Sequence, residues 1–385
     1  MNRLARAVAL TATALVACLL AGCGDAEPDT STAADDNGRL SFELTADGCS
    51  PTSARAAAGP VTIAATNRTH VADELELVDA GTTVLGERED IAPGESAELT
   101  LTLQPGRYAV YCGFQSGQRT HGTLTVGGRA AAAHGTAAPV LDRAVEEYRE
   151  YVERESAQLV TDTTTFVAAL KAGRLQRAKD LFGPTRVHYE TIEPIAESFG
   201  DLDPEIDARV NDVADRSTWS GFHRIEQILW QRGTTEGTER YADKLLADVK
   251  TLHARIPGIE LQAAQVANGA VGLLDEVSGS KITGEEDRYS HTDLADFQAN
   301  LTGSREAFER LEPALRASGG ARLVEQVEAQ FAQVQSGLDR YRRDTPLGFA
   351  RYTELTQQDR RAFAQQLAAL TEPLSQVAGT LVRQR

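Results

Sequence analysis

The residues best suited to chemistry lie between Trp219 and Trp230. His223 and Glu226 are three positions apart, so on a helix an imidazole and a carboxylate would share one face. Metal sites in helical bundles use this Glu/His spacing. The alternative is a hydrogen-bonded pair in the core, because the flanking aromatic residues indicate burial and an unpartnered buried group is costly. The stretch differs from HExxH, in which two zinc-binding histidines bracket a catalytic glutamate.

An acidic stretch upstream could supply further ligands. Glu190, Glu193 and Glu197 follow one another at helical spacing and would lie on one helix face. Pro194 removes a helical hydrogen-bond donor and should bend this helix. An exposed charged face is the alternative. Because two protein ligands bind a cation weakly, Glu190 and Glu193 are the first candidates to complete the site.

A second acidic stretch, residues 284–293, also offers ligands. Asp287 and His291 lie within it, and Ser290 with Asp293 resembles a capping box at the start of a helix. Asp287 and His291 are therefore further candidates for the same site, with a role in the loop or the cap as the alternative.

The N-terminus predicts a lipoprotein signal peptide over residues 1–22. Two arginines precede an apolar run that is too short for a permanent membrane helix. The run ends in Leu20-Ala21-Gly22-Cys23, a lipobox, so we expect cleavage before Cys23 and lipidation of its thiol. An ordinary secretory signal is the alternative. Residues 23–38 are polar and acidic, which predicts a tether, and the mature protein would then work outside the cytoplasm, anchored to the cell membrane.

Two cysteines, Cys49 and Cys112, remain in the predicted mature domains. An extracytoplasmic pair normally forms a disulfide. The competing interpretation is a metal site in which two thiolates lie beside Glu74 and Glu76, although these two carboxylates could also form a solvent-exposed strand face. Methionine occurs once, at position 1, so the axial ligand of an ordinary blue-copper electron carrier is missing.

Two different periodicities divide the rest of the chain. Residues 39–127 alternate between apolar and polar side chains, with Gly and Pro turn signals at short intervals, which predicts a small β-sandwich. In residues 139–385 apolar side chains recur every three or four positions, which predicts an all-α helical bundle. Residues 128–138 are a low-complexity linker. The sequence thus predicts a multi-domain protein.

Charge limits the classes of partner. The 385 residues carry a formal net charge of −17. A nucleic-acid-binding protein needs a basic footprint, so we expect no nucleic acid partner. An acidic protein attracts cations, although solubility alone would also explain the charge.

Several long motifs resemble the EfeO family, the extracytoplasmic components of bacterial iron-uptake systems. The motifs are residues 87–94, 103–106, 184–197, 201–203 with 206–209, 221–226, 280–293 and 296–300. The resemblance extends over essentially the whole mature chain. It implies a cupredoxin-like domain followed by an imelysin-like domain, in agreement with the division at residues 128–138.

The resemblance also implies roles for particular residues. The Gly-x-His-x-x-Glu motif of the imelysin-like domain falls on Gly221, His223 and Glu226, which would bind metal, and Glu190 and Glu193 lie in another shared motif.

In the cupredoxin-like domain the resemblance implies a metal site of two cysteines and acidic residues. It therefore favours Cys49 and Cys112 as ligands, with Glu74 and Glu76, over a disulfide. This chain departs from the family in a longer loop after Cys112 that bears His121, which would be an extra ligand.

The function that follows is iron binding outside the cytoplasm and delivery of the iron to a membrane iron permease, without catalysis. The cargo would be iron, with copper as a further candidate in the β-sandwich. The resemblance implies two partners from the same uptake system, the permease and a haem-containing peroxidase. The alternative is a metal-dependent enzyme, either a metallopeptidase or a ferroxidase that uses copper in the β-sandwich.

Overall fold

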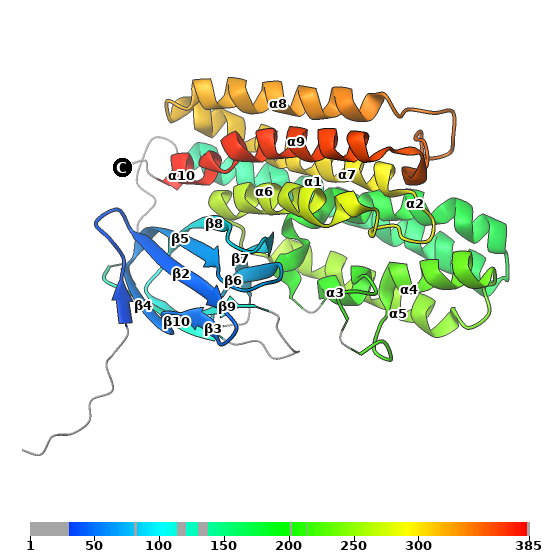
Figure 1. Ribbon diagram of the computed structural model, residues 1–385, viewed down its shortest axis with the longest axis horizontal. Coiled ribbons are helices and arrows are strands. Elements are labelled where there is room, and N and C mark those ends of the chain that lie inside the picture. The colour runs from blue at the N-terminus through cyan, green and yellow to red at the C-terminus, as the bar shows by residue number, and fades with distance from the viewer. Residues whose placement is uncertain are drawn as a thin grey trace, which may run out of the picture. The chain divides into compact units, whose positions relative to one another are not determined.

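The computed structural model describes residues 31–80, 83–113, 121–129, 138–200, 202–213 and 215–382. The predicted signal peptide and the predicted lipidation site Cys23 lie outside these residues. Figure 1 shows the strands in the first part of the chain and the helices in the second. The predicted order, a β-sandwich followed by an all-α bundle, is confirmed.

The sandwich consists of two sheets. The six-stranded sheet has the order β1-β4-β10-β9-β6-β7, and the four-stranded sheet has the order β3-β2-β5-β8. Alternation builds the core between them: Leu40, Phe42 and Leu44 of β2 are buried while the residues between them are not. The strands are β1 (Ser31–Ala33), β2 (Arg39–Thr45), β3 (Gly48–Ser50), β4 (Ser53–Ala57), β5 (Gly59–Asn67), β6 (Asp73–Val78), β7 (Val84–Ile91), β8 (Ser96–Leu103), β9 (Gly106–Cys112) and β10 (His121–Gly127).

The first strand begins inside the segment predicted to be a tether. β1 (Ser31–Ala33) pairs in parallel with β4, which otherwise pairs with β10. The backbone of an edge strand offers unpaired N–H and C=O groups whatever the side chains are. A polar Ser-Thr-Ala segment can therefore join the sheet even though its sequence carries no strand pattern.

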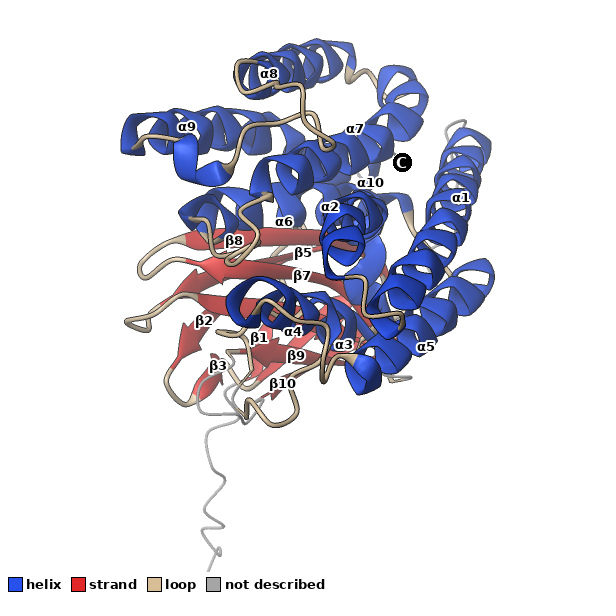
Figure 2. Cartoon of the chain, turned by 90° about the vertical axis from the view of Figure 1, so that its right-hand side faces the viewer, coloured by secondary structure: helices blue, strands red, loops and turns tan. Residues whose placement is uncertain are grey.

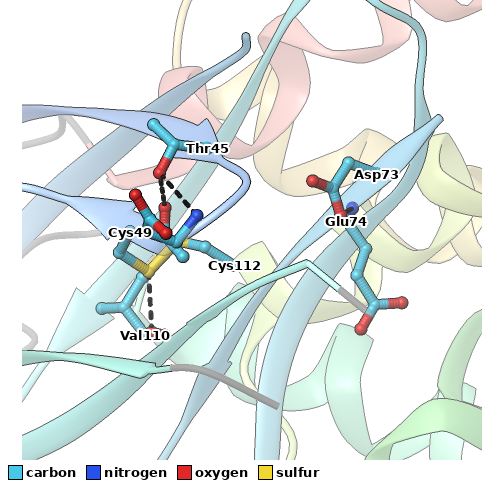
Figure 3. Close-up of a disulfide and its surroundings, with 8 residues drawn as sticks. Thr45, Cys49, Asp73, Glu74, Val110 and Cys112 are labelled. Atoms are coloured by element: carbon cyan, nitrogen blue, oxygen red, sulfur yellow. Dashed lines mark hydrogen bonds between the residues drawn. A yellow bond between two sulfur atoms is a disulfide. The ribbon is translucent and has the colours of Figure 1, made fainter. Parts of the chain in front are cut away.

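Cys49 and Cys112 form a disulfide, so the prediction that they are free thiolate ligands is wrong (Figure 3). Cys49 lies on β3 and Cys112 ends β9, and the bond therefore joins the two sheets. Their Cα atoms are 5.1 Å apart, within the usual range for a disulfide. Both side chains belong to the apolar core of the sandwich.

The two glutamates predicted to accompany the cysteines lie on the other face of the sheet. Leu75 pairs with Cys112 across β6 and β9 and shares the sandwich core with it. Because successive side chains of a strand point to opposite faces, Glu74 and Glu76 point away from that core. Figure 3 shows the Glu74 side chain well apart from the disulfide. The thiolate–carboxylate site predicted for iron or copper is therefore not formed.

The predicted extra ligand His121 begins β10 and is exposed, with its ring centroid 5.3 Å from that of Tyr111. No cluster of three possible metal ligands occurs among the described residues of the sandwich.

The disulfide should stabilise the sandwich strongly. It joins residues 63 positions apart in the sequence, and closing such a loop in the unfolded chain is worth about 4 kcal/mol. Replacing both cysteines (Cys49→Ser with Cys112→Ser) is expected to lower the free energy of unfolding by about 2–4 kcal/mol in urea titrations. The unreduced wild-type protein should show neither thiol to a thiol reagent, and two reactive thiols would contradict the assignment.

The helical part supplies the elements that position the candidate site. They are α1 (Ala138–Lys171), α2 (Leu175–Ile192), η2 (Glu193–Phe199), α3 (Leu202–Asp207), α4 (Gly221–Gln227), η3 (Ile228–Arg232), α5 (Glu239–Arg255), η4 (Ile256–Gly258), α6 (Ala263–Gly279), η5 (Lys281–Thr283), α7 (Asp293–Ala317), α8 (Ala321–Asp339), η6 (Tyr352–Glu354), α9 (Gln357–Leu374) and α10 (Gln376–Val382). Where a bend was predicted at Pro194, the helix changes type: α2 ends at Ile192 and the chain continues as a 3-10 helix.

Helix α6 joins the two parts of the chain, and Figure 2 shows it beside the sheets. The Arg88 guanidinium of β7 donates to the Asn268 carbonyl of α6 at 2.9 Å. The Asn268 amide donates in return to the Thr100 carbonyl of β8 at 2.7 Å. These buried polar contacts fix one face of α6 to the sandwich.

Candidate metal centre

Buried ionisable side chains converge at one place in the helical part. We call this set the cage. It consists of Glu190 from α2, Asp207 from α3, His223 and Glu226 from α4, Glu286 and Asp287 from the segment before α7, and Asp296 from α7. Asp207 is 10% exposed at its side chain, and the others are 2% or less.

Gly221 explains how α4 brings His223 into the cage. Its φ is +81°, a conformation that favours glycine. A Cβ at this position would lie 2.2 Å from the Ile206 carbonyl oxygen. The glycine thus lets the start of α4 approach the end of α3, where Asp207 lies 3.6 Å from His223 Nε2. This gives a structural reason for the glycine of the motif.

The two residues of the Glu/His pair contact each other, as their spacing predicts. His223 Nδ1 lies 3.3 Å from Glu226 Oε2. The other oxygen of Glu226 accepts the backbone N–H groups of Tyr289 and Ser290 at 2.9 and 2.7 Å. The segment before α7 therefore holds Glu226 in place, and a π-helix, η3, follows the pair directly. Such π-helical turns are frequent at functional sites.

Three overlapping groups in the cage could each hold a cation. Their ligand atoms all lie within 4.8 Å of one another in each group. The groups are Asp207, His223 and Glu286; His223, Glu226 and Asp287; and Glu190, Glu286 and Asp296. His223 Nε2 lies 3.2 Å from Glu286 Oε1 and makes no hydrogen bond. The imidazole and carboxylate donors of the first two groups are ligands that suit iron.

Glu193 and Glu190 lie beside the His223 groups and are bridged by a buried lysine. Lys281 Nζ is 2.6 Å from Glu193 Oε1 and 3.4 Å from Glu190 Oε2. The Asn300 amide also donates to both carboxylates, at 2.8 and 2.9 Å. Glu190 belongs to one of the three groups, whereas Glu193 belongs to none of those found among the described residues.

The structure brings Asp287, but not His291, to the Glu/His pair. Asp287 is fully buried and groups with His223 and Glu226. His291 is half-buried and lies in none of the groups formed by the described residues. Its backbone N–H donates to the Asp287 carbonyl at 2.8 Å. His291 therefore shapes the turn that carries Asp287.

Sequence reasoning missed four residues that shape the cage: Arg186, Asp207, Glu286 and Asp296. Arg186 is fully buried and contacts five carboxylates. All four lie inside the motifs at 184–197, 206–209, 280–293 and 296–300. A search of those motifs for every charged residue would have included these four among its candidates, without showing which of the candidates meet His223.

Burial and mutual repulsion raise the pKa of several carboxyl groups. Burial, and then Glu226, raise the pKa of Asp287 to about 6 against the opposing effect of Arg186. Burial, and then Asp287, raise the pKa of Asp296 well above its usual value. Burial and the neighbouring Glu190 do the same to Glu193, against Lys281. The site thus holds more carboxylates than its own cations neutralise, and a bound metal cation would relieve the repulsion.

Two carboxylates of the cage instead stay ionised. Burial tends to raise the pKa of Asp207, but Arg186 and His223 outweigh it and lower the pKa. Lys281 and His223 likewise outweigh burial and hold the pKa of Glu286 well below its usual value. Both carboxylates face His223 Nε2, at 3.6 Å from Asp207 Oδ1 and 3.2 Å from Glu286 Oε1.

Comparison with known proteins assigns both parts of the chain. The imelysin family model matches residues 144–377, and the cupredoxin-like domain model matches residues 11–126. The protein thus combines a cupredoxin-like domain with an imelysin domain. A crystal structure described as an iron-regulated protein A precursor from Parabacteroides distasonis has a similar fold, with a TM-score of 0.51 at 15% identity. The matched region covers 65% of this chain and 97% of the Parabacteroides distasonis chain.

Curated relatives are more similar. The iron uptake system component EfeO of Escherichia coli K12 is 44% identical over 338 residues, which are 86% of this chain and 88% of the relative. The EfeO proteins of Escherichia coli O157:H7 and Shigella flexneri match with the same identity and coverage. The chain belongs to the EfeO family of iron uptake system components. None of the helices in the described part of the chain has the length and apolar character needed to cross a membrane.

Proposed function

We propose that the protein binds iron in the cage and delivers it to a membrane iron permease. The observation that carries this proposal is the arrangement around His223, where one imidazole and the carboxylates of Asp207, Glu226, Glu286 and Asp287 converge in a buried position. The curated relatives are named as iron uptake components, which supports iron as the cargo.

The proposed role is binding without catalysis. The alternative remains a metal-dependent enzyme, either a metallopeptidase or a ferroxidase. Cys49 and Cys112 are bonded to each other, so they do not supply the thiolates that the copper ferroxidase alternative requires. The candidate ligands around His223 also differ from the two-histidine arrangement of HExxH peptidases.

Metal analysis of the purified protein tests this function. After exposure to ferrous iron without oxygen, or to ferric citrate, we expect stoichiometric iron to remain bound through gel filtration. Iron oxidation beyond the bound equivalents, or cleavage of a peptide library that depends on the metal, would favour the enzyme instead. A wild-type protein that retains no iron in either form would refute the proposal.

We further propose that lipid on Cys23 holds the protein at the outer side of the cell membrane, next to the permease and a haem-containing peroxidase of the same uptake system. The lipobox Leu20-Ala21-Gly22-Cys23 supports the anchor. The Cys23→Ser variant is expected to move from the membrane fraction into the periplasm or medium. Equal partitioning of variant and wild type into the detergent phase would show that Cys23 carries no lipid.

A further inference from the structure

A fully buried arginine lies among the candidate iron ligands. The Arg186 guanidinium contacts the carboxylates of Glu190, Asp207, Glu286, Asp287 and Asp296. It also lies 5.8 and 5.7 Å from the ring centroids of Phe182 and Phe222. The two aromatic rings pack against the guanidinium, and the carboxylates surround its positive charge as they would surround a bound cation.

Arg186 contacts the same two oxygen atoms that face the candidate ligand nitrogen. Glu286 Oε1 is 2.7 Å from Arg186 Nη2 and 3.2 Å from His223 Nε2. Asp207 Oδ1 contacts Arg186 Nη1 and lies 3.6 Å from His223 Nε2. A cation coordinated by His223 Nε2 and these carboxylates must therefore share oxygen atoms that already pair with the Arg186 guanidinium.

We propose that Arg186 is an internal counter-cation that competes with iron for Glu286 and Asp207 and so speeds the release of iron to its acceptor. The inference rests on the proposed function. When iron leaves, the guanidinium keeps both carboxylates paired, so that departure does not leave bare buried charges. Iron would then leave across a lower barrier than from a cage without such a partner.

Lys281 provides a matched control, because it carries the same charge into the same region without contacting these oxygen atoms. It is 1% exposed, and its Nζ lies 2.6 Å from Glu193 Oε1 and 3.4 Å from Glu190 Oε2. Lys281 Nζ lies 3.9 Å from Glu286 Oε2, which is not the oxygen atom that faces His223. Neutralising Lys281 therefore changes the net charge by the same amount as neutralising Arg186, but removes no competitor for Oε1.

The experiment compares iron release from the wild type, Arg186→Gln and Lys281→Gln. Each full-length mature protein is loaded with ferric citrate, freed of excess iron and mixed with a strong ferric chelator, and the rate of iron loss is followed. We expect Arg186→Gln to release iron about tenfold more slowly than the wild type, equivalent to about 1.4 kcal/mol. Lys281→Gln should slow release by a clearly smaller factor.

Two results would overturn the inference. Release from Arg186→Gln that is unchanged or faster would show that the arginine positions the ligands rather than competing with iron. Equal slowing in both variants would show that only net charge matters. A wild type that binds no iron would instead refute the proposed function itself.

A further variant covers the case in which Arg186→Gln does not fold. Arg186→Lys keeps the charge but replaces the planar fork, which reaches both oxygen atoms, with a single ammonium. We expect it to release iron more slowly than the wild type. Release as fast as, or faster than, that of the wild type would also overturn the inference.

Discussion

Replacing His223 with alanine is expected to lower the affinity for iron by about tenfold or more, a loss of about 1.4 kcal/mol or greater. His223 belongs to two of the three groups that could hold a cation, and it supplies the nitrogen ligand of both. Without it, the remaining carboxylates repel one another more strongly and offer only oxygen ligands. Competition titrations with a chelator of known affinity, on the full-length mature protein, would measure the loss.

The control for this variant is a histidine outside the cage. His253 is half-buried and hydrogen-bonded through Nδ1 to Ser156 Oγ at 2.8 Å. His253→Ala should therefore leave iron affinity unchanged. The fold of His223→Ala should survive, because the helical core is large. Normal iron binding by His223→Ala would place the site elsewhere, and simple unfolding would identify His223 as a core residue.

Iron affinity is also expected to rise steeply as the pH increases from about 6 to above neutrality. Burial and Arg186 lower the pKa of His223, but Asp207 and Glu226 outweigh them, so the pKa lies well above 6.5. In the absence of iron, His223 therefore keeps its proton to a higher pH than a free imidazole does. An imidazolium cannot coordinate a metal, so binding must release this proton. Asp287, with a pKa of about 6, adds a second proton at the acidic end of the range.

The sign of the effect follows directly. Below these pKa values protons occupy the ligands and weaken iron binding, and above them the ligands are free. Each released proton changes the affinity about tenfold per pH unit. Calorimetry at pH 7 in two buffers of different ionisation enthalpy should show release of at least one proton per iron. His223→Ala should release about one proton fewer, and an affinity independent of pH would contradict the assignment of His223 as a ligand.

Much of the site could be predicted from the sequence because helical spacing is local. The three-residue separation of His223 and Glu226 places them on one face of α4. The missing N–H of Pro194 predicts the irregularity at the end of α2, where a 3-10 helix follows. The long motifs indicated the family, and the family resemblance predicted both domain types. These inferences need no knowledge of how distant segments pack.

The partners of the Glu/His pair could not be derived in this way. Asp207, Glu286 and Asp296 come from separate segments, and nothing in their local sequence tells which of the chain's many carboxylates will meet His223. The same holds for Arg186, whose role depends on five carboxylates brought to it by tertiary packing.

The sandwich shows the same division between local and tertiary information. The sequence by itself determined the alternation in β6, which sends Leu75 to one face and Glu74 and Glu76 to the other. Only the tertiary structure decided which face Cys112 shares, because that depends on the register between β6 and β9, and it also brought Cys49 from the opposite sheet within bonding distance. Register and sheet packing are non-local. The sequence alone therefore could not show that the predicted metal site is a disulfide.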